Sequence, residues 1–206
     1  HLMISGKPTA PFTITSTGCV ESTAAFAATA NTGNRPVTHW YWNLGDNTEV
    51  TDVSTLNHTY LAPGTYTVKQ TLITDIGCLA DTLEKSITIH EKPVANFNVN
   101  GAVCIEQPVS FEDLSTVGGG NTITKWSWLS NNTPVTMGNE TGTNIYTYKF
   151  TQETNFEIGL AVESDKGCKS DTIRKQIAVK GLPSIGFILP VACVNDVAAQ
   201  FTDTSS

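Results

Sequence analysis

The sequence HWYWNLGDNTEV, residues 39–50, places two tryptophans at alternate positions just before a Gly-Asp-Asn turn. Successive side chains of a β-strand point to opposite faces, so Trp40, Trp42 and Leu44 share one face while Tyr41 lies on the other. A strand with one apolar face is what the core of a β-sandwich needs. We therefore expect both tryptophans in the core and Tyr41 at the surface.

The same pair recurs as Trp126 and Trp128, which we also expect in the core. It belongs to a longer repeat, because KPTAPFTITSTGCVESTAAF, KPVANFNVNGAVCIEQPVSF and LPSIGFILPVACVNDVAAQF each place Phe four residues after Pro, then Cys, then Phe. A recurrence at about 85 to 90 residues is too long for a solenoid and indicates tandem domains. The predicted modules are residues 1–90, residues 91–180 and, in 181–206, the truncated start of a third.

Short stretches of alternating apolar and polar residues recur along each module, and helical periodicity is absent. Six or seven short strands in about 90 residues, separated by turn residues, are the signature of an immunoglobulin-like sandwich. The predicted fold class is therefore all-β, with tandem immunoglobulin-like β-sandwiches. Domains this small bury only about 60% of their unfolded surface, so additional covalent links would stabilise them.

Five cysteines follow the same repeat. Cys19 and Cys104 precede the second strand of their modules, Cys78 and Cys168 lie in the last hairpin, and Cys193 aligns with the first two. We predict the disulfides Cys19–Cys78 and Cys104–Cys168, with Cys193 unpaired; five reduced, buried cysteines are the alternative. Each bond would stabilise its module by roughly 4 kcal/mol on the chain-entropy model. Disulfides indicate an oxidising compartment, so we expect an extracellular or cell-surface protein.

The composition argues against several classes of function. Lys and Arg number 12 against 19 Asp and Glu, the net charge is -7, and no basic cluster is present to bind nucleic acid. No window approaches the roughly 18 apolar residues of a membrane span, so we expect no membrane insertion. The cysteines form no CxxC pair for zinc. No nucleophile elbow, phosphate loop, HExxH motif or dinucleotide fingerprint occurs, so we expect no enzyme.

The motif WNLGDN, residues 42–47, followed by NHTYLAPGTYTV, residues 57–68, resembles a PKD (polycystic kidney disease) repeat. The hallmarks of that family are Trp-x-Phe-Gly-Asp-Gly and His-x-Tyr-x-x-Pro-Gly-x-Tyr-x-Val. The resemblance covers almost all of the first module, and the added cysteines resemble repeats of long, secreted multidomain proteins of Bacteroidetes. It implies adhesion or gliding-associated surface proteins as hosts. The structural motif residues are Trp40, Trp42, Gly45, Asp46, His58, Tyr60, Pro63, Gly64 and Tyr66, with Trp126 and Trp128 in the second module.

The motif residues have roles that turn chemistry predicts. Gly45 permits a positive φ, and Asp46 accepts backbone N–H groups. The Pro-Gly pair reverses the chain into the strand that bears Tyr66. Tyr60 or Tyr66 buries its ring and bonds its hydroxyl to the backbone, as in the tyrosine corner of other sandwiches. His58 is interpreted as a packing and hydrogen-bonding residue rather than a catalytic base.

The second module departs from the motif. Asn131 and Asn132 replace the Gly-Asp pair, and because Asn tolerates left-handed geometry the turn is expected to survive without its carboxylate. Tyr148 is expected to keep the place of Tyr60, while Phe156 takes the place of the second tyrosine. The residues common to both modules are architectural, which argues against a shared binding site.

Asp46, Asn47, Glu49 and Asp52 offer oxygen ligands after the tryptophan strand. Their spacing is not that of a calcium loop ending in a bidentate Glu, so solvated turn acids are the simpler interpretation and calcium is the alternative. No other cofactor is expected.

Two Asp-Thr-apolar triplets contain Thr82 and Thr172. They resemble the O-glycosylation acceptors of Bacteroidetes, and the plain start of a strand would give the same recurrence.

We expect a non-catalytic structural spacer and interaction segment of a larger secreted or cell-surface protein, adhesin-like or gliding-associated. As a fragment it is expected to be monomeric, with a protein or glycan at a cell surface as partner. The alternative is a carbohydrate-binding accessory module of a secreted glycanase or protease, which requires Tyr41 and Tyr146 to lie coplanar on one face. A protein-binding module with an exposed sheet edge is a third hypothesis.

Overall fold

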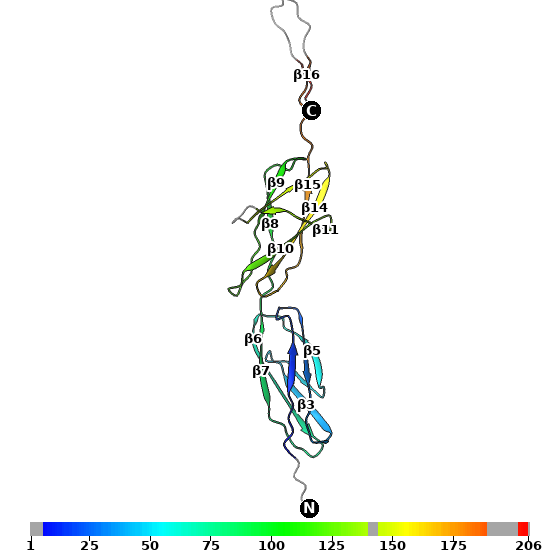
Figure 1. Ribbon diagram of the computed structural model, residues 1–206, viewed down its shortest axis with the longest axis vertical. Helices are drawn as coiled ribbons and strands as arrows, with labels where there is room; N and C mark the ends of the chain where they lie inside the picture. Colours follow the sequence, from blue (N-terminus) through cyan, green and yellow to red (C-terminus); the bar gives the residue numbers. More distant parts are fainter. Residues whose placement is uncertain (1–5, 140–143, 189–201, 206) are drawn as a thin grey trace, which may run out of the picture. The chain divides into compact units, whose positions relative to one another are not determined.

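The computed structural model describes residues 6–139, 144–188 and 202–205, and these residues form strands and turns without a helix (Figure 1). The predicted all-β fold class is confirmed. Within this part of the chain, no helix has the length and apolarity that crossing a membrane requires. The strands are β1 (Phe12–Thr15), β2 (Thr23–Ala28), β3 (Val37–Asn43), β4 (Glu49–Thr51), β5 (Thr55–Thr59), β6 (Gly64–Thr74), β7 (Leu83–Ile89), β8 (Phe97–Asn100), β9 (Pro108–Asp113), β10 (Ile123–Ser130), β11 (Thr133–Val135), β12 (Gly138–Asn139), β13 (Ile145–Lys149), β14 (Asn155–Ser164), β15 (Ile173–Ala178), β16 (Phe187–Ile188) and β17 (Thr202–Asp203).

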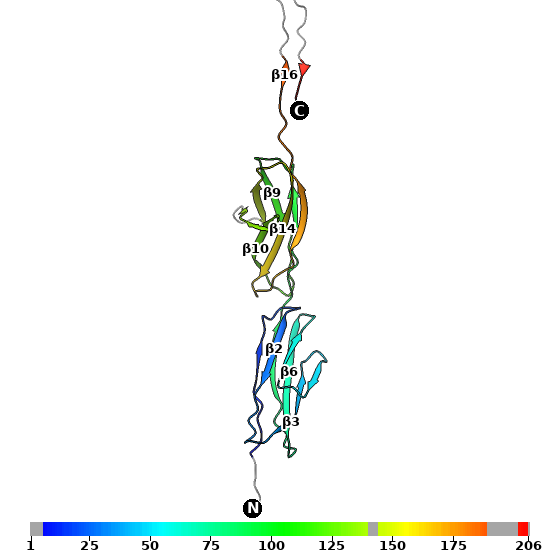
Figure 2. The same cartoon turned by 90° about the vertical axis from the view of Figure 1, so that its right-hand side faces the viewer.

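Strands β1–β7, called the first strand set, form two sheets with the orders β1-β2-β5 and β4-β3-β6-β7. Figure 2 labels β2 of the smaller sheet and β3 and β6 of the larger sheet. All pairings are antiparallel, with Phe12 opposite Ala28 and Phe26 opposite Leu56. Because side chains alternate along each strand, this register gathers the large apolar residues on one face of each sheet. The two faces meet in a common core.

Trp42 occupies the middle of that core. Its ring meets Phe12 and Phe26 edge to face at centroid distances of 5.3 and 6.1 Å. Its Nε1 donates a hydrogen bond to the Val53 carbonyl at 2.9 Å, so the only polar atom of the side chain is satisfied. The buried cluster draws on both sheets and contains Phe12, Ala24, Phe26, Trp42, Leu44, Tyr60, Val68, Ile87 and Ile89.

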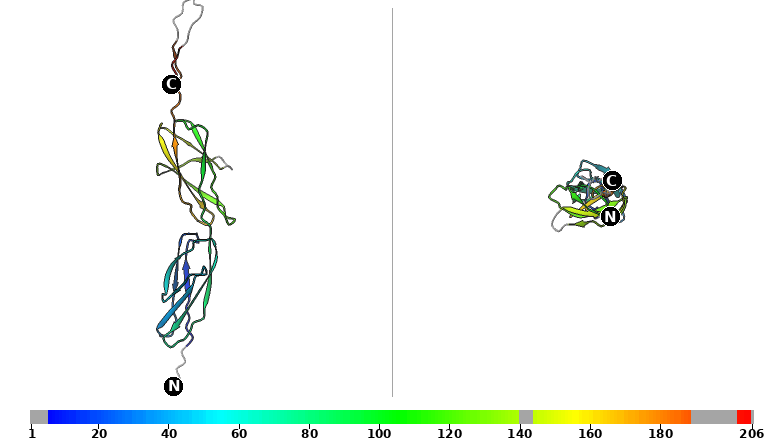
Figure 3. Two further views of the ribbon diagram at one scale, coloured as in Figure 1. Left: turned by 180° about the vertical axis from the view of Figure 1, so that it is seen from behind. Right: turned by 90° about the horizontal axis from the view of Figure 1, so that it is seen from above.

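Strands β8–β15, called the second strand set, pair in the same way. Figure 3 shows these strands from behind, in green, yellow and orange. Their sheets have the orders β12-β13-β9-β8 and β11-β10-β14-β15, so only β12 lacks a counterpart in the first set. Trp128 packs edge to face on Phe97 at 5.1 Å and also meets Phe111, which reproduces the group around Trp42. Phe111 lies opposite Tyr146, as Phe26 lies opposite a residue of β5.

By backbone contacts the chain divides into two compact units. The first comprises the residues up to Ala95 with Ser115–Trp126 and Ala161–Thr172, and the second comprises Asn96–Leu114, Ser127–Leu160 and the residues from Ile173 onward. The predicted module boundaries remain predictions. In the predicted third module β16 pairs with β17, and Cys193 lies outside the described residues.

The alternation predicts that all four tryptophans lie in the core, but the structure buries only two of them. Trp42 is 2% exposed and Trp128 is also buried, as expected. Trp40 is only partly buried, and Trp126 is 36% exposed, so the prediction for Trp126 is wrong. Tyr41 lies at the surface, as expected.

The hairpins at the ends of β6 and β14 explain the difference between the outer tryptophans. Trp40 packs against a small apolar cluster that includes Ala80. In the second strand set Ser170 takes the place of Ala80, and its hydroxyl accepts a hydrogen bond from the Val162 N–H at 2.9 Å. A hydroxyl in place of a methyl group gives Trp126 less apolar surface to pack against.

Candidate functional site

The Gly-Asp turn after β3 adopts the predicted geometry. Gly45 has a φ of 86°, which confirms its expected role, and a Cβ at this position would lie 2.8 Å from the Thr67 carbonyl oxygen. Asp46 accepts the Thr48 N–H at 3.1 Å, as turn chemistry predicts. Glycine is required here both for the left-handed backbone and for the close approach of β6.

His58 is the second partner of the Asp46 carboxylate. Its Nε2 lies 2.6 Å from Asp46 Oδ2, and both side chains are mostly buried. Burial raises the pKa of Asp46, but hydrogen bonds from His58 and Thr48 outweigh it and hold this pKa below its usual value. His58 therefore ties β5 to the Gly-Asp turn, and the interpretation of a hydrogen-bonding residue is confirmed.

Both motif tyrosines bond their hydroxyls to the backbone. Tyr60 is fully buried and donates to the Leu44 carbonyl at 2.9 Å, while Tyr66 donates to the Ala62 carbonyl at 2.8 Å. Their rings stack at a centroid distance of 4.3 Å, just before and just after the turn that contains Pro63 and Gly64. Burial above all, and then the neighbouring Asp46 and Tyr66, raise the pKa of Tyr60 to about 12. The expected tyrosine corner is present: Tyr60 buries its ring and bonds its hydroxyl to the Leu44 carbonyl, and Tyr66 bonds its own within the turn.

The second strand set keeps the left-handed turn after its tryptophan strand but, in its described residues, lacks the tyrosine corner. Asn131 and Asn132 have φ values of 48° and 62°, so the predicted left-handed turn survives. The prediction that Tyr148 takes the place of Tyr60 is wrong. The register of β9 with β13 places Phe150 there, where it is buried and packs on Phe156 at 4.8 Å.

The four proposed calcium ligands do not converge. Asp46 is hydrogen-bonded to His58 and Thr48. Glu49 Oε1 accepts a hydrogen bond from the Asn43 side chain at 3.0 Å. Asp52 lies 2.9 Å from His39 Nδ1. Asn47 has a φ of 69° as part of the turn. Within residues 6–139, 144–188 and 202–205, no group of three or more His, Cys, Asp or Glu could hold a metal ion. The turn acids have structural roles.

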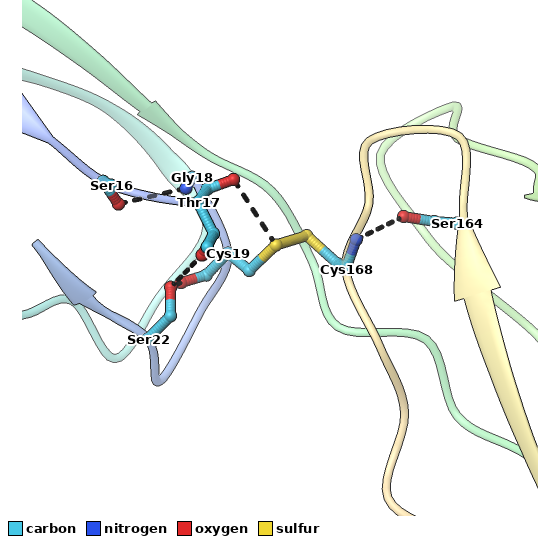
Figure 4. Close-up of a disulfide and its surroundings, with 7 residues drawn as sticks. All are labelled: Ser16, Thr17, Gly18, Cys19, Ser22, Ser164 and Cys168. Carbon is cyan, nitrogen blue, oxygen red and sulfur yellow. Dashed lines mark hydrogen bonds between the residues drawn. A yellow bond between two sulfur atoms is a disulfide. The ribbon is translucent and has the colours of Figure 1, made fainter.

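The disulfide found joins Cys19 to Cys168, so the predicted bonds Cys19–Cys78 and Cys104–Cys168 are wrong (Figure 4). The two Cα atoms lie 5.5 Å apart, and 149 positions separate the residues in the sequence. Among the described residues, Cys78 and Cys104 are free thiols. The bond lies within the first compact unit and links the loop between β1 and β2 to the hairpin between β14 and β15.

The length of β7 explains why Cys19 does not reach Cys78. Cys19 forms a backbone bridge with His90, directly after the end of β7, whereas Cys78 lies in the hairpin that precedes Leu83 at the other end. A strand of this length spans about 23 Å, and a disulfide joins Cα atoms no more than about 7 Å apart. In the second strand set Cys104 bridges Lys180 in the same way, beyond the far end of β15 from Cys168.

Charged residues surround the disulfide. Lys92 Nζ lies 2.9 Å from Asp171 Oδ1 and 3.2 Å from Glu21 Oε2. Its hydrogen bonds to Asp171 and then to Glu21 raise the pKa of Lys92. Glu21 follows Cys19 by two residues and Asp171 follows Cys168 by three, so the lysine connects the same two segments as the disulfide. Sequence reasoning missed the role of this lysine, although the Lys-Pro pair that opens the first two repeats could have marked it.

The predicted pairing of Tyr41 with Tyr146 on one exposed face does not form. Tyr41 is 39% exposed, but Tyr146 is 6% exposed and packs on Trp128. Tyr41 lines a pocket of about 190 Å³ together with Glu49 and Gln70. That volume is below the roughly 300 Å³ at which ligand pockets usually begin, so the geometry does not favour a sugar site.

The proposed glycosylation acceptors lie next to the hairpins. Thr82 is exposed and Thr172 is partly buried, each directly before its strand, and modification of either remains a prediction. The preceding acids have a structural role, because Asp171 pairs with Lys92 and Asp81 pairs with Lys7. Ion pairing accounts for the two aspartates, and the two threonines directly precede β7 and β15.

Two solved structures and one family model resemble parts of this chain. Fibronectin(III)-like modules of Clostridium thermocellum CbhA match 83% of this chain and 95% of theirs, with 18% identity and a TM-score of 0.45. A structure of carbohydrate-binding modules from the β-sandwich superfamily matches 77% of this chain and 58% of its own, with 16% identity and a TM-score of 0.41. A search of curated proteins finds no match. At these TM-scores the solved structures add nothing to the fold assignment, which rests on the strands and on a family model: residues 5–89 match the PKD domain.

Proposed function

We propose that the chain is a non-catalytic structural spacer and interaction segment of a larger secreted or cell-surface protein, of the adhesin or gliding-associated kind. Its modules are residues 1–90 and residues 91–180, and a third begins at residue 181. The disulfide supports an oxidising compartment outside the cytosol. The buried hydrogen-bonded motif residues support an architectural role.

The observation that carries this proposal is the position of the disulfide. Tension applied at the two ends of the chain passes through the Cys19–Cys168 bond, which encloses β2 to β14. A covalent bond does not lengthen under forces that unfold β-sheets. The strands between the two cysteines are therefore shielded from extension, which is the property that a spacer under load needs.

Single-molecule force spectroscopy with handles at both ends tests this role. The 149-residue separation corresponds to about 500 Å of extended chain at roughly 3.3–3.6 Å per residue. The oxidised chain should therefore reach a final extension about 500 Å shorter than the Cys168→Ser variant. Cys78→Ser is the matched control and should behave as the oxidised wild type. Equal extensions for the wild type and Cys168→Ser would contradict the proposal.

The proposed partner is a protein or glycan at a cell surface. Strands β4 and β7 form the two edges of the larger sheet of the first strand set, so each has backbone groups on its outer side for a pairing strand. A protein partner that adds a strand is the form of interaction that this topology supports.

A further inference from the structure

Two cysteines of the repeat have no disulfide partner among the described residues, although each lies in the same setting as a bonded cysteine. Cys78 and Cys104 are both partly exposed. Cys168 is fully buried and Cys19 nearly so. In the bonded pair, a loop cysteine (Cys19) binds a hairpin cysteine (Cys168).

The hairpin of Cys78 has the same hydrogen bonds as the hairpin of Cys168. The Cys78 N–H donates to Thr74 Oγ1 at 3.3 Å, and the Cys168 N–H donates to Ser164 Oγ at 3.3 Å. The N–H of Thr74 donates to the Cys78 carbonyl at 3.1 Å, and that of Ser164 to the Cys168 carbonyl at 2.9 Å. Both hairpins carry a left-handed glycine directly before the cysteine.

The loop of Cys104 has the same backbone contacts as the loop of Cys19. Cys19 forms a parallel bridge with His90, and Cys104 forms one with Lys180. Two residues later the glutamates of both loops have positive φ values, 64° at Glu21 and 59° at Glu106. The sequences Cys-Val-Glu and Cys-Ile-Glu place a cysteine and a glutamate at the same spacing, and the Glu106 carboxylate pairs with Lys149 while that of Glu21 pairs with Lys92.

A Lys–Asp ion pair lies beside each of the two hairpin cysteines. Lys92 contacts Asp171 beside Cys168, and Lys7 contacts Asp81 beside Cys78. Each lysine directly precedes the proline of its repeat. Lys92 binds a third group, Glu21 of the Cys19 loop, whereas Asp81 is the only carboxylate that pairs with Lys7 within residues 6–139, 144–188 and 202–205.

We propose that Cys78 and Cys104 are complementary halves of further junctions like the one between Cys19 and Cys168. The Cys78 hairpin, with Lys7, binds a Cys-x-Glu loop, and the Cys104 loop, with Glu106, binds a Gly-Cys hairpin that carries a Lys–Asp pair. The occupant of each half is another β-sandwich module of this kind. The inference rests on the proposed spacer function and names its covalent partner.

Bond formation requires a disulfide oxidant, for which oxidised glutathione serves. The thiolate of one cysteine attacks glutathione disulfide and releases one glutathione thiolate as a mixed disulfide forms. The thiolate of the second cysteine then displaces the other glutathione. Two protein thiols lose two protons and two electrons, and one glutathione disulfide becomes two glutathione thiols.

The full chain tests the proposal, since a second copy supplies the missing half. The Cys193→Ser chain is incubated in a glutathione redox buffer, and its intermolecular disulfides are quantified by non-reducing gels and peptide mass spectrometry. Random pairing gives about twice as much Cys78–Cys104 product as either homodisulfide, whereas a docked junction should exceed random pairing by about tenfold. Lys7→Ala should lower that selectivity about two- to fivefold, and Lys69→Ala, which removes an exposed ion pair with Glu84 elsewhere, should not.

Random pairing, a bond between Cys78 and Cys104 of one chain, or failure to form any intermolecular bond overturns the proposal. Equal selectivity in the Lys7→Ala and Lys69→Ala chains overturns it as well. Because this test measures pairing and the force experiment measures extension, either can fail without the other.

Discussion

Removing the hydroxyl of Tyr60 tests whether the motif acts through its buried hydrogen bonds. The ring is fully buried, and its hydroxyl donates to the Leu44 carbonyl at 2.9 Å. Tyr60→Phe keeps the stacking on Tyr66 but leaves that carbonyl without its donor. An unpaired buried polar group costs about 1–3 kcal/mol, and each kcal/mol lowers the melting temperature of a domain this small by about 4–8 °C.

Tyr66→Phe is the matched control because it makes the same chemical change at an exposed bond. Its hydroxyl donates to the Ala62 carbonyl, and water can replace that donor. We expect a loss below about 1 kcal/mol for this variant. Urea unfolding of the oxidised chain, followed by tryptophan fluorescence, measures both free energies. Equal losses for the two variants would refute the assignment of stability to the buried bond.

The pKa of Tyr60 gives an independent test of the same burial. It is raised to about 12 in the folded chain, so folding favours the protonated phenol. The corresponding stability is fully present below the unfolded pKa of about 10 and is lost as the pH rises toward 12. The free energy of unfolding should therefore fall in this window in the wild type and fall less in Tyr60→Phe.

Three further outcomes are expected. Gly45→Ala should destabilise by more than about 2 kcal/mol, because its Cβ meets Thr67 backbone at 2.8 Å, while Gly77→Ala, at a similar φ but in open space, should cost only about 1–2 kcal/mol in thermal unfolding. The lowered pKa of Asp46 stabilises the fold above the unfolded pKa, so this contribution should disappear as the pH falls through the folded pKa. A urea series at acid pH should show a flatter stability profile for Asp46→Asn, and a profile equal to that of the wild type would exclude the Asp46 carboxylate as the source of this contribution. Chelation with EDTA should leave the melting temperature unchanged, and a decrease would restore the calcium hypothesis.

The sequence predicts the sandwich because alternation and turn chemistry are local. The tryptophan alternation places Trp42 and Trp128 correctly, and the left-handed positions at Gly45 and Asn131 follow from residue type. The exposure of Trp126 depends on a substitution in a distant hairpin, which local patterning does not reveal.

The disulfide required information that the repeat alone does not contain. Aligning the modules shows that Cys19 corresponds to Cys104, and Cys78 to Cys168, but not which end of the sandwich each occupies. Counting residues along β7 supplies the missing step, since the two cysteines of one module flank the full length of that strand. The two cysteines of one module are then too far apart for a disulfide, so the bond has to join cysteines of different repeats.

Similarly, the replacement of Tyr60 by Phe150 becomes clear only from the strand register. Alignment by residue type matches Tyr148 to Tyr60, but the pairing of β9 with β13 shows that the equivalent residue lies two positions later, at Phe150. Phe150 fills the core without a hydroxyl to satisfy.

Non-reducing peptide mapping by mass spectrometry tests the central claim most directly. The purified, monomeric chain should yield a peptide pair that links Cys19 to Cys168, with Cys78 and Cys104 recovered as free thiols. Linkage of Cys19 to Cys78 and of Cys104 to Cys168 would contradict the structure, the proposed path of tension and the complementary halves inferred from it.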